Sequence, residues 1–188
     1  MRYVSAAEAG RLLREGKVGL VPTETVVGLV AGEAGLSRLF GIKGRDPDKP
    51  IAFLCASVEE AFALARNVPP LARLLAERFW PGPLTLVLDG RYGTVGVRVP
   101  AHPVVQTILA EYGGPLHASS ANLSGEPAPH GLEDVDPRVS AVVGFAVRGQ
   151  PGSGEASAVV DLSRGQVRLL RATKRLTGDE LTRLTNPA

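Results

Sequence analysis

Val18-Gly19-Leu20-Val21-Pro22-Thr23-Glu24-Thr25 is the stretch that decides the fold class. Residues 18–21 form a short apolar run without charge, which predicts a buried strand, and Pro22 ends it. The loop that follows presents two hydroxyls and a carboxylate at the end of this strand, where they can hold a small polar ligand. The hydroxyls of Thr23 and Thr25 would equally suit a helix cap.

Helix and strand patterns alternate on both sides of this run. Ser5 and Glu8 have the spacing of a capping box and Gly16 supplies a stop, so a helix between them opens the chain. By similar signals we expect helices over 36–42, after Ser57, after Pro70, over 104–109 and after Thr177. We expect strands over 51–54, 84–88, 94–99, 139–147, 158–162 and 167–171. Helices mixed with hairpin-like strand pairs predict an α/β fold with a twisted, mixed sheet and flanking helices.

Composition narrows the class of protein. The 188 residues are 44% hydrophobic, which suits one core, and the linker-like stretch 149–155 is too short to separate domains, so we expect one domain over 1–188. A formal charge of +2 argues by itself for neither a nucleic acid nor a membrane surface. The single cysteine, Cys55, excludes a disulfide framework. No apolar window reaches the ~18 residues of a membrane helix, so we expect a soluble, cytoplasmic protein without a membrane partner.

Two basic segments suit anionic groups. Lys43-Gly44-Arg45 combines a compact charge and a bidentate fork around a glycine that lets a ligand approach closely, although a solvated charged loop would also explain it. Over 93–100, period-two alternation places Thr94, Gly96 and Arg98 on one strand face and valines on the other. An arginine between apolar strand residues needs an anionic partner, which is either a protein carboxylate or a ligand.

A polar segment follows the apolar run that begins at Leu116. Ser119-Ser120-Ala121-Asn122-Leu123-Ser124-Gly125 offers hydroxyls and an amide suited to phosphate or ribose oxygens, or else forms a simple turn. The chain has no Walker-type phosphate loop, no Gly-x-Gly-x-x-Gly fingerprint and no nucleophile elbow. Its three histidines lack metal-ligand spacing. The sequence therefore disfavours a hydrolase, a dehydrogenase or an NTPase of the common type.

Five ordered motifs carry a resemblance to a known family. They are Val21 to Leu29, Lys43-Gly44-Arg45, Trp80 to Leu88, Val97 to Pro100 with His102-Pro103, and Ser120 to Gly125. In order and spacing, from about residue 5 to 181, the chain resembles the YrdC-like threonylcarbamoyl-AMP synthases. The resemblance implies a twisted α/β sheet enclosing a concave basic cavity. It also implies a nucleotidyltransferase that converts L-threonine, bicarbonate and ATP to threonylcarbamoyl-AMP and pyrophosphate, with Mg²⁺ on the phosphates. The product would pass to tRNA through a threonylcarbamoyl-transfer complex.

The resemblance also implies roles for individual residues. It assigns L-threonine to Thr23, Arg98, the backbone at Ala118, and Ser157. It assigns the nucleotide to Lys43, Thr94, Ser120, Asn122 and Arg171. Lys43 and Arg45 would be the catalytic cations, with Arg45 helping to anchor anionic groups. No side-chain nucleophile and no metal-binding side chain is assigned.

The chain departs from the family pattern at several positions. Val27 stands where a tyrosine is usual, Arg148 and Gln150 replace residues of an Asp-Gly-Gly, Ala158 replaces a threonine, and Ala172-Thr173 replaces a Pro-Gly. We favour a divergent loop with activity intact over a paralogue with altered or lost adenylation. Two other functions compete: a non-catalytic module that binds double-stranded RNA or tRNA, and an enzyme that forms carbamoyl-adenylate from carbamoyl phosphate.

Overall fold

One mixed sheet organises the protein. The computed structural model describes residues 1–44 and 51–185, and in these ranges a 10-stranded sheet has the order β1-β8-β2-β3-β7-β4-β6-β5-β9-β10. The strands are β1 (Tyr3–Val4), β2 (Val18–Val21), β3 (Gly28–Ala31), β4 (Ala52–Leu54), β5 (Leu84–Gly90), β6 (Gly93–Arg98), β7 (Leu116–Ser120), β8 (Phe145–Val147), β9 (Ala158–Asp161) and β10 (Arg168–Arg171). The sheet contains both parallel pairs, such as β4 with β6, and antiparallel pairs, such as β5 with β6, which confirms the predicted mixed sheet.

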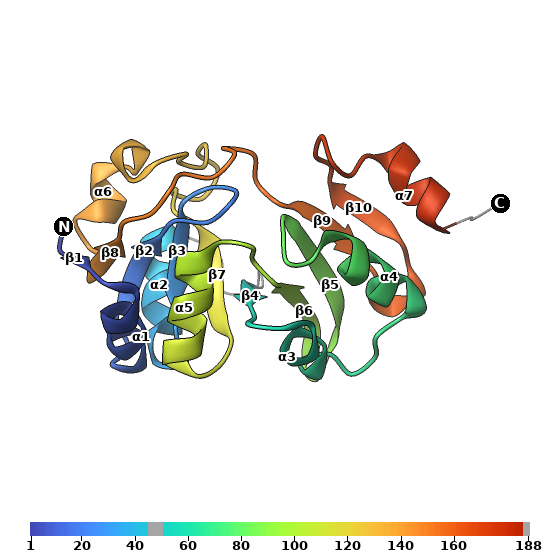
Figure 1. Ribbon diagram of the computed structural model, residues 1–188, viewed down its shortest axis with the longest axis horizontal. Helices are drawn as coiled ribbons and strands as arrows, with labels where there is room; N and C mark the ends of the chain where they lie inside the picture. Colours follow the sequence, from blue (N-terminus) through green and yellow to red (C-terminus); the bar gives the residue numbers. More distant parts are fainter. Residues whose placement is uncertain (45–50, 186–188) are drawn as a thin grey trace.

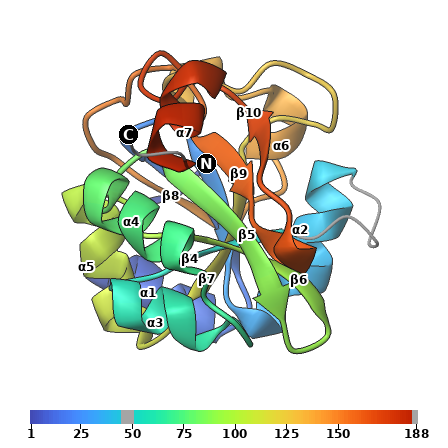
Figure 2. The same cartoon turned by 90° about the vertical axis from the view of Figure 1, so that its right-hand side faces the viewer.

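Helices cover both faces of this sheet. They are α1 (Ala6–Arg14), α2 (Leu36–Lys43), α3 (Val58–Ala63), α4 (Pro70–Phe79), α5 (Pro103–Tyr112), α6 (Pro137–Ser140) and α7 (Gly178–Thr185), with 3-10 turns at Glu33–Gly35, Leu132–Asp134 and Ser163–Gly165. Figure 2 shows α1, α3, α4 and α5 on one side of the sheet and α2 and α6 on the other. In Figure 1 the strands β1, β8, β2, β3 and β7 form one half of the molecule, and β6, β5, β9 and β10 form the other.

The apolar run over 18–21 is the buried strand that its sequence predicts. Every residue of β2 is buried, and the strand lies between β8 and β3. Val18 and Leu20 pack into the core cluster beside α2, whereas Val21 packs into the cluster beside α1 and α5. Gly19 lies so close to Phe145 that a Cβ atom there would stand 2.2 Å from the ring, so the pairing of β2 with β8 requires a residue without a side chain at this position.

The second half of the sheet separates an apolar face from a polar one. Val95, Val97 and Val99 pack into the core with α3 and α4, whereas Thr94, Gly96 and Arg98 line a cavity on the opposite face. The period-two prediction for 93–100 is thereby confirmed. Strands β5 and β9 repeat this division between a core face and a cavity face, and Thr85 of β5 and Ser157, which directly precedes β9, add hydroxyls to the cavity.

Of the remaining sequence predictions, one is confirmed, one is wrong in part and one is not tested. The Ser5 side chain accepts a hydrogen bond from the Glu8 backbone N–H at 3.1 Å and caps α1 as predicted. The strand predicted over 139–147 is wrong in its first half, because Asp136 caps a helical turn and leaves only Phe145–Val147 as strand. Over 1–44 and 51–185, none of the helices has the length and apolarity needed to cross a bilayer. The expectation of one domain over 1–188 stays a prediction.

Candidate functional site

A cavity of about 800 Å³ lies on the polar face of the sheet. Its walls come from the loop after β2, the end of α2, strands β4 to β7, and strands β9 and β10. All the predicted site residues that the structure describes line this cavity: Thr23, Lys43, Thr94, Arg98, Ala118, Ser120, Asn122, Ser157 and Arg171. Arg45 lies outside the described residues. Thr23, Lys43, Arg98 and Ser120 come from four of the five motifs, and Thr85 of the motif Trp80 to Leu88 lines the same cavity.

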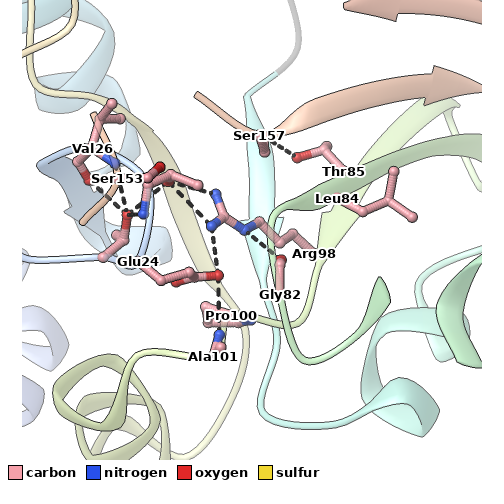
Figure 3. A network of polar contacts seen from close by, with 12 residues as sticks. Glu24, Val26, Gly82, Leu84, Thr85, Arg98, Pro100, Ala101, Ser153 and Ser157 are labelled. Carbon is pink, nitrogen blue, oxygen red and sulfur yellow. Dashed lines mark hydrogen bonds and ion pairs between the residues drawn. The ribbon is translucent and has the colours of Figure 1, made fainter. Parts of the chain in front are cut away.

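Arg98 is the most deeply buried cation of the site after Lys43. Its Nε donates to the Gly82 carbonyl at 3.1 Å, and both terminal nitrogens donate to Thr25 Oγ1 at 3.2 Å. Its Nη2 also pairs with Glu24 Oε1 at 2.7 Å (Figure 3). The anionic partner that the sequence analysis left open is therefore a protein carboxylate, in a loop about 70 residues earlier in the chain.

The Glu24 carboxylate is ionised by its surroundings. Burial raises its pKa, but the charge and hydrogen bond of Arg98, together with the backbone N–H of Ala101, outweigh burial and lower the pKa below its ordinary value. Glu24 Oε2 is buried and has no hydrogen-bond partner among the described residues. The sequence placed Glu24 and Thr25 in a loop that could hold a polar ligand, but it did not pair either residue with Arg98, because a local pattern does not reveal which strand will lie opposite a loop.

Thr23 closes a tight turn after β2. Its Oγ1 donates to the Val26 carbonyl at 2.6 Å and accepts from the backbone N–H groups of Thr25 and Val26 at 3.1 and 3.2 Å. No helix follows, so the helix-cap reading does not apply. The turn presents the hydroxyls of Thr23 and Thr25 to the cavity.

Lys43 ends α2 and is almost completely buried, with 3% of its surface exposed. Its Nζ donates to the Ser120 carbonyl at 2.7 Å, to Ser120 Oγ at 3.1 Å and to Asn122 Oδ1 at 2.8 Å. These contacts join the basic motif to the polar segment after β7 and fix an ammonium charge in the cavity wall. The solvated-loop reading of Lys43 is therefore wrong.

A third group of polar side chains lies across the cavity, on β5, on β10 and directly before β9. Thr85 Oγ1 and Ser157 Oγ are 2.9 Å apart, and Figure 3 shows the two hydroxyls facing each other. Arg171 donates from Nε to the Ser157 carbonyl at 2.6 Å and from Nη2 to Ser157 Oγ at 3.3 Å. Burial and the like charge of Arg98 lower the pKa of Arg171. Thr85 lies in the motif Trp80 to Leu88, but the sequence assigned no role to it, because a threonine in an apolar strand carries no local signal of function.

The charge of the cavity lining is predominantly positive. Arg164 and Arg168 join Lys43, Arg98 and Arg171 in the wall. Asp161 also lines it, but its Oδ2 pairs with Arg168 Nη2 at 2.7 Å. Such a lining favours anionic ligands such as phosphates and carboxylates.

The oxygen donors of the site suit a hard cation that arrives with phosphates. No cluster of three or more His, Cys, Asp or Glu side chains forms over 1–44 and 51–185. Hydroxyls of Ser119, Ser120 and Ser124 and the carboxylate of Asp161 line the cavity. Mg²⁺ prefers oxygen ligands, and in nucleotide sites it is held by one or two protein side chains together with the phosphates. These residues therefore fit Mg²⁺.

The departures from the family pattern lie away from the main cavity wall. Val27 is buried and, with Arg148, lines a second cavity of about 540 Å³ on the other side of Thr23. Arg148 lies over the Tyr3 ring, 4.3 Å from its centre. The Gln150 carbonyl is 3.1 Å from His102 Nε2, and Ala158 is a buried residue of β9. None of these side chains lines the main cavity.

Comparison with protein families gives one clear match. The model Sua5_yciO_yrdC, described as "Telomere recombination", matches residues 11–173. The match covers most of the chain and all five motifs of the sequence analysis.

Individual relatives agree with this match. A threonylcarbamoyl-AMP synthase of Pyrococcus abyssi is 39% identical over 180 residues, which are 87% of this chain and 52% of that protein. A protein of the same name from Bacillus subtilis is 36% identical over 183 residues, 88% of this chain and 52% of that protein. The chain thus spans about half the length of these two relatives. The solved structure of P. abyssi Sua5 complexed with L-threonine superposes with a TM-score of 0.83 at 35% identity, over 90% of this chain and 56% of that one.

Proposed function

The chain belongs to the Sua5_yciO_yrdC family, and on this premise we propose that it is an L-threonylcarbamoyladenylate synthase. The observation that carries the proposal is the convergence of Lys43, Arg98 and Arg171 with hydroxyls of separate strands in one cavity. Support comes from relatives named for this activity and from the threonine complex of a protein with the same fold. The proposed reaction takes L-threonine, bicarbonate and ATP to threonylcarbamoyl-AMP, pyrophosphate and water.

We place L-threonine against Thr23, Arg98, Ala118 and Ser157. Arg98 would hold the carboxylate, because a buried guanidinium with a free N–H is the strongest carboxylate donor in the wall. The hydroxyl of Thr23, in the loop after β2, and Ala118, on β7, line the same cavity as Arg98. Ser157 lies opposite them, where Arg171 fixes its carbonyl.

We place ATP along Lys43, Thr94, Ser120, Asn122 and Arg171. Lys43 would supply a compact positive charge to the phosphates, and its contacts with Ser120 and Asn122 hold that charge in position before ATP binds. Arg171 would approach the phosphates from the other wall. Arg45, the second proposed catalytic cation, lies outside the described residues.

The chemistry requires positioning and charge compensation. The threonine amino nitrogen attacks bicarbonate and water leaves, which gives a carbamate. A carbamate oxygen then forms a bond to the α-phosphorus of ATP, and the bond from that phosphorus to the β-phosphate oxygen breaks, so pyrophosphate leaves with the electron pair. Two anions must approach each other, and preorganised cations such as Lys43, Arg98 and Arg171 lower the cost of that approach.

Mg²⁺ belongs to the proposed substrate complex. It would neutralise phosphate charge, held chiefly by the phosphates with hydroxyls such as that of Ser120 nearby. The product would be passed to tRNA by a threonylcarbamoyl-transfer complex in the cytoplasm.

Pyrophosphate release by purified protein with Mg²⁺ and ATP tests the proposal. We expect release only when both L-threonine and bicarbonate are present, and at least a 100-fold loss in Lys43→Ala. Lys17→Ala, an exposed lysine outside the cavity, is the matched control and should keep wild-type activity. Release supported by carbamoyl phosphate alone would identify a carbamoyl-adenylate enzyme. No release from folded protein that binds tRNA would favour the non-catalytic alternative.

A further inference from the structure

The carboxylate of Glu24 lies behind the cavity, next to its most important arginine. Thr23 and Thr25 line the cavity, but Glu24 does not. Its Oε1 accepts hydrogen bonds from Arg98 Nη2 at 2.7 Å and from the Ala101 backbone N–H at 3.1 Å. Figure 3 shows Glu24 between these two partners. One oxygen atom therefore joins the loop after β2, the end of β6 and the segment that leads into α5.

The pair between Glu24 and Arg98 is a one-point contact. A guanidinium has five N–H donors. Four of the Arg98 donor directions are taken: Nε by Gly82, Nη2 by Glu24 and Thr25, and one N–H of Nη1 by Thr25. The second N–H of Nη1 has no acceptor among the described residues. Glu24 Oε2 accepts nothing either, so the two groups do not form the bidentate pair that would occupy both edges.

We propose that Glu24 is a positioning residue for the threonine site: it fixes the plane of the Arg98 guanidinium and leaves one Nη1 N–H for the substrate carboxylate. The inference rests on the proposed function, in which Arg98 holds L-threonine. Glu24 touches no substrate and acts through Arg98 alone. Because Arg98 is buried, with 7% of its surface exposed, its orientation depends chiefly on such protein contacts.

The kinetics of Glu24→Gln separate positioning from a purely structural role. Glutamine keeps an acceptor oxygen for Ala101 but loses the charge that holds Arg98. We expect the KM for L-threonine to rise tenfold or more, with the KM for ATP and kcat within threefold of wild type. Glu60→Gln is the matched control, because Glu60 Oε2 also accepts a backbone N–H, from Ala56 at 2.6 Å, away from the cavity. Unchanged KM for L-threonine in folded Glu24→Gln, or an equal rise for both substrates, would overturn the proposal.

Nitrogen-detected NMR of the arginine side chains gives a measurement that needs no turnover, and its result on the wild-type protein needs no variant. In the wild type, the hydrogen bonds that Nη2 donates to Glu24 and Thr25 should slow rotation about the Cζ–Nη bonds of Arg98 and keep its Nη1 and Nη2 signals separate. In Glu24→Gln the two signals should merge. Merged signals in the wild-type protein would refute the positioning role. Absence of turnover in the wild type with separate Arg98 signals would instead count against the proposed function and leave the positioning of Arg98 standing.

Discussion

Arg171→Met should abolish most activity while leaving the protein almost as stable as the wild type. Arg171 lies on the outer strand β10 with its guanidinium turned to Ser157, and no carboxylate among the described residues pairs with it. Because Arg171 is partly desolvated near another arginine, we expect it to contribute more to binding an anionic ligand than to the stability of the fold. Methionine keeps much of the apolar stem and removes only the charge and its donors.

The opposing contributions to stability are of similar size. Loss of a charged hydrogen bond to the Ser157 carbonyl, at 2.6 Å, costs about 1.5–3 kcal/mol at most. Residue 171 as a whole is exposed on β10, so water screens this contact. Its guanidinium is partly desolvated and repelled by Arg98, and removing both effects offsets part of the cost of the lost hydrogen bond. We expect a net change within about 1 kcal/mol. In the reaction, loss of one preorganised donor to a developing charge costs about 2.7–4 kcal/mol, or roughly 100- to 1,000-fold in kcat/KM.

Two measurements on the same preparations check this expectation. Urea denaturation gives the free energy of unfolding, and threonine-dependent pyrophosphate release gives kcat/KM. Arg175→Met is the matched control, because Arg175 is exposed, lies four residues further on and does not line the cavity. A kcat/KM for Arg171→Met within threefold of wild type, or an equal loss in Arg175→Met, would refute the reasoning. So would a loss of several kcal/mol in stability, since it would mean that Arg171 serves the fold.

Three further predictions follow from buried groups. Gly19→Ala should destabilise the protein by about 1–3 kcal/mol in urea denaturation, because the new methyl group collides with the Phe145 ring; an unchanged midpoint would contradict that packing. Burial raises the pKa of Glu24, but pairing with Arg98 outweighs burial and leaves the pKa below its ordinary value of 4.5, so its contribution to stability is present above about pH 4.5 and lost as the pH falls through the folded-state pKa. The stability difference between wild type and Glu24→Gln should therefore shrink in denaturation series below pH 4.5, and a constant difference down to pH 3 would disprove it. Burial, with a smaller effect of a nearby carboxylate, raises the pKa of Cys55 to about 12, so a disulfide reagent at pH 8 should label it only after unfolding in guanidinium; rapid labelling of native protein would count against this.

The elements that local chemistry specifies were predictable. Val18–Val21 is a strand because its residues are apolar on both faces, and the valines of β6 follow the period of a strand with one buried face. The helix α1 begins at Ser5 because that side chain caps it. The strand predicted over 139–147 failed because apolar residues alone do not distinguish a strand from a capped helical turn, and the Asp136-Pro137 start of α6 went unused.

The site residues likewise divide into those that the sequence could predict and those whose contacts depend on the fold. Thr23, Lys43, Arg98 and Asn122 could be proposed because each lies in a motif that resembles a known family, and Ser157 because the resemblance extends along the chain beyond those motifs. Nothing in a single sequence says that two segments will be neighbours across a sheet. Strand β7 pairs with both β3 and β4, and Lys43, which lies between these two strands in the chain, contacts Ser120 and Asn122 at the end of β7 and just after it.

The contact between Glu24 and Arg98 shows why the partner of a buried charge is hard to infer. From the sequence, the partner of Arg98 was either a ligand or a protein carboxylate, and the structure contains a carboxylate that takes only one side of the guanidinium. The two alternatives are therefore compatible: a protein anion sets the orientation, and a ligand anion can use the N–H that remains. A buried arginine fully paired by protein would be a structural element, and an unpaired one would be costly before substrate arrives. An incomplete pair avoids both outcomes, which makes the unsatisfied Oε2 of Glu24 a better indication of a binding site than the charge of Arg98 by itself.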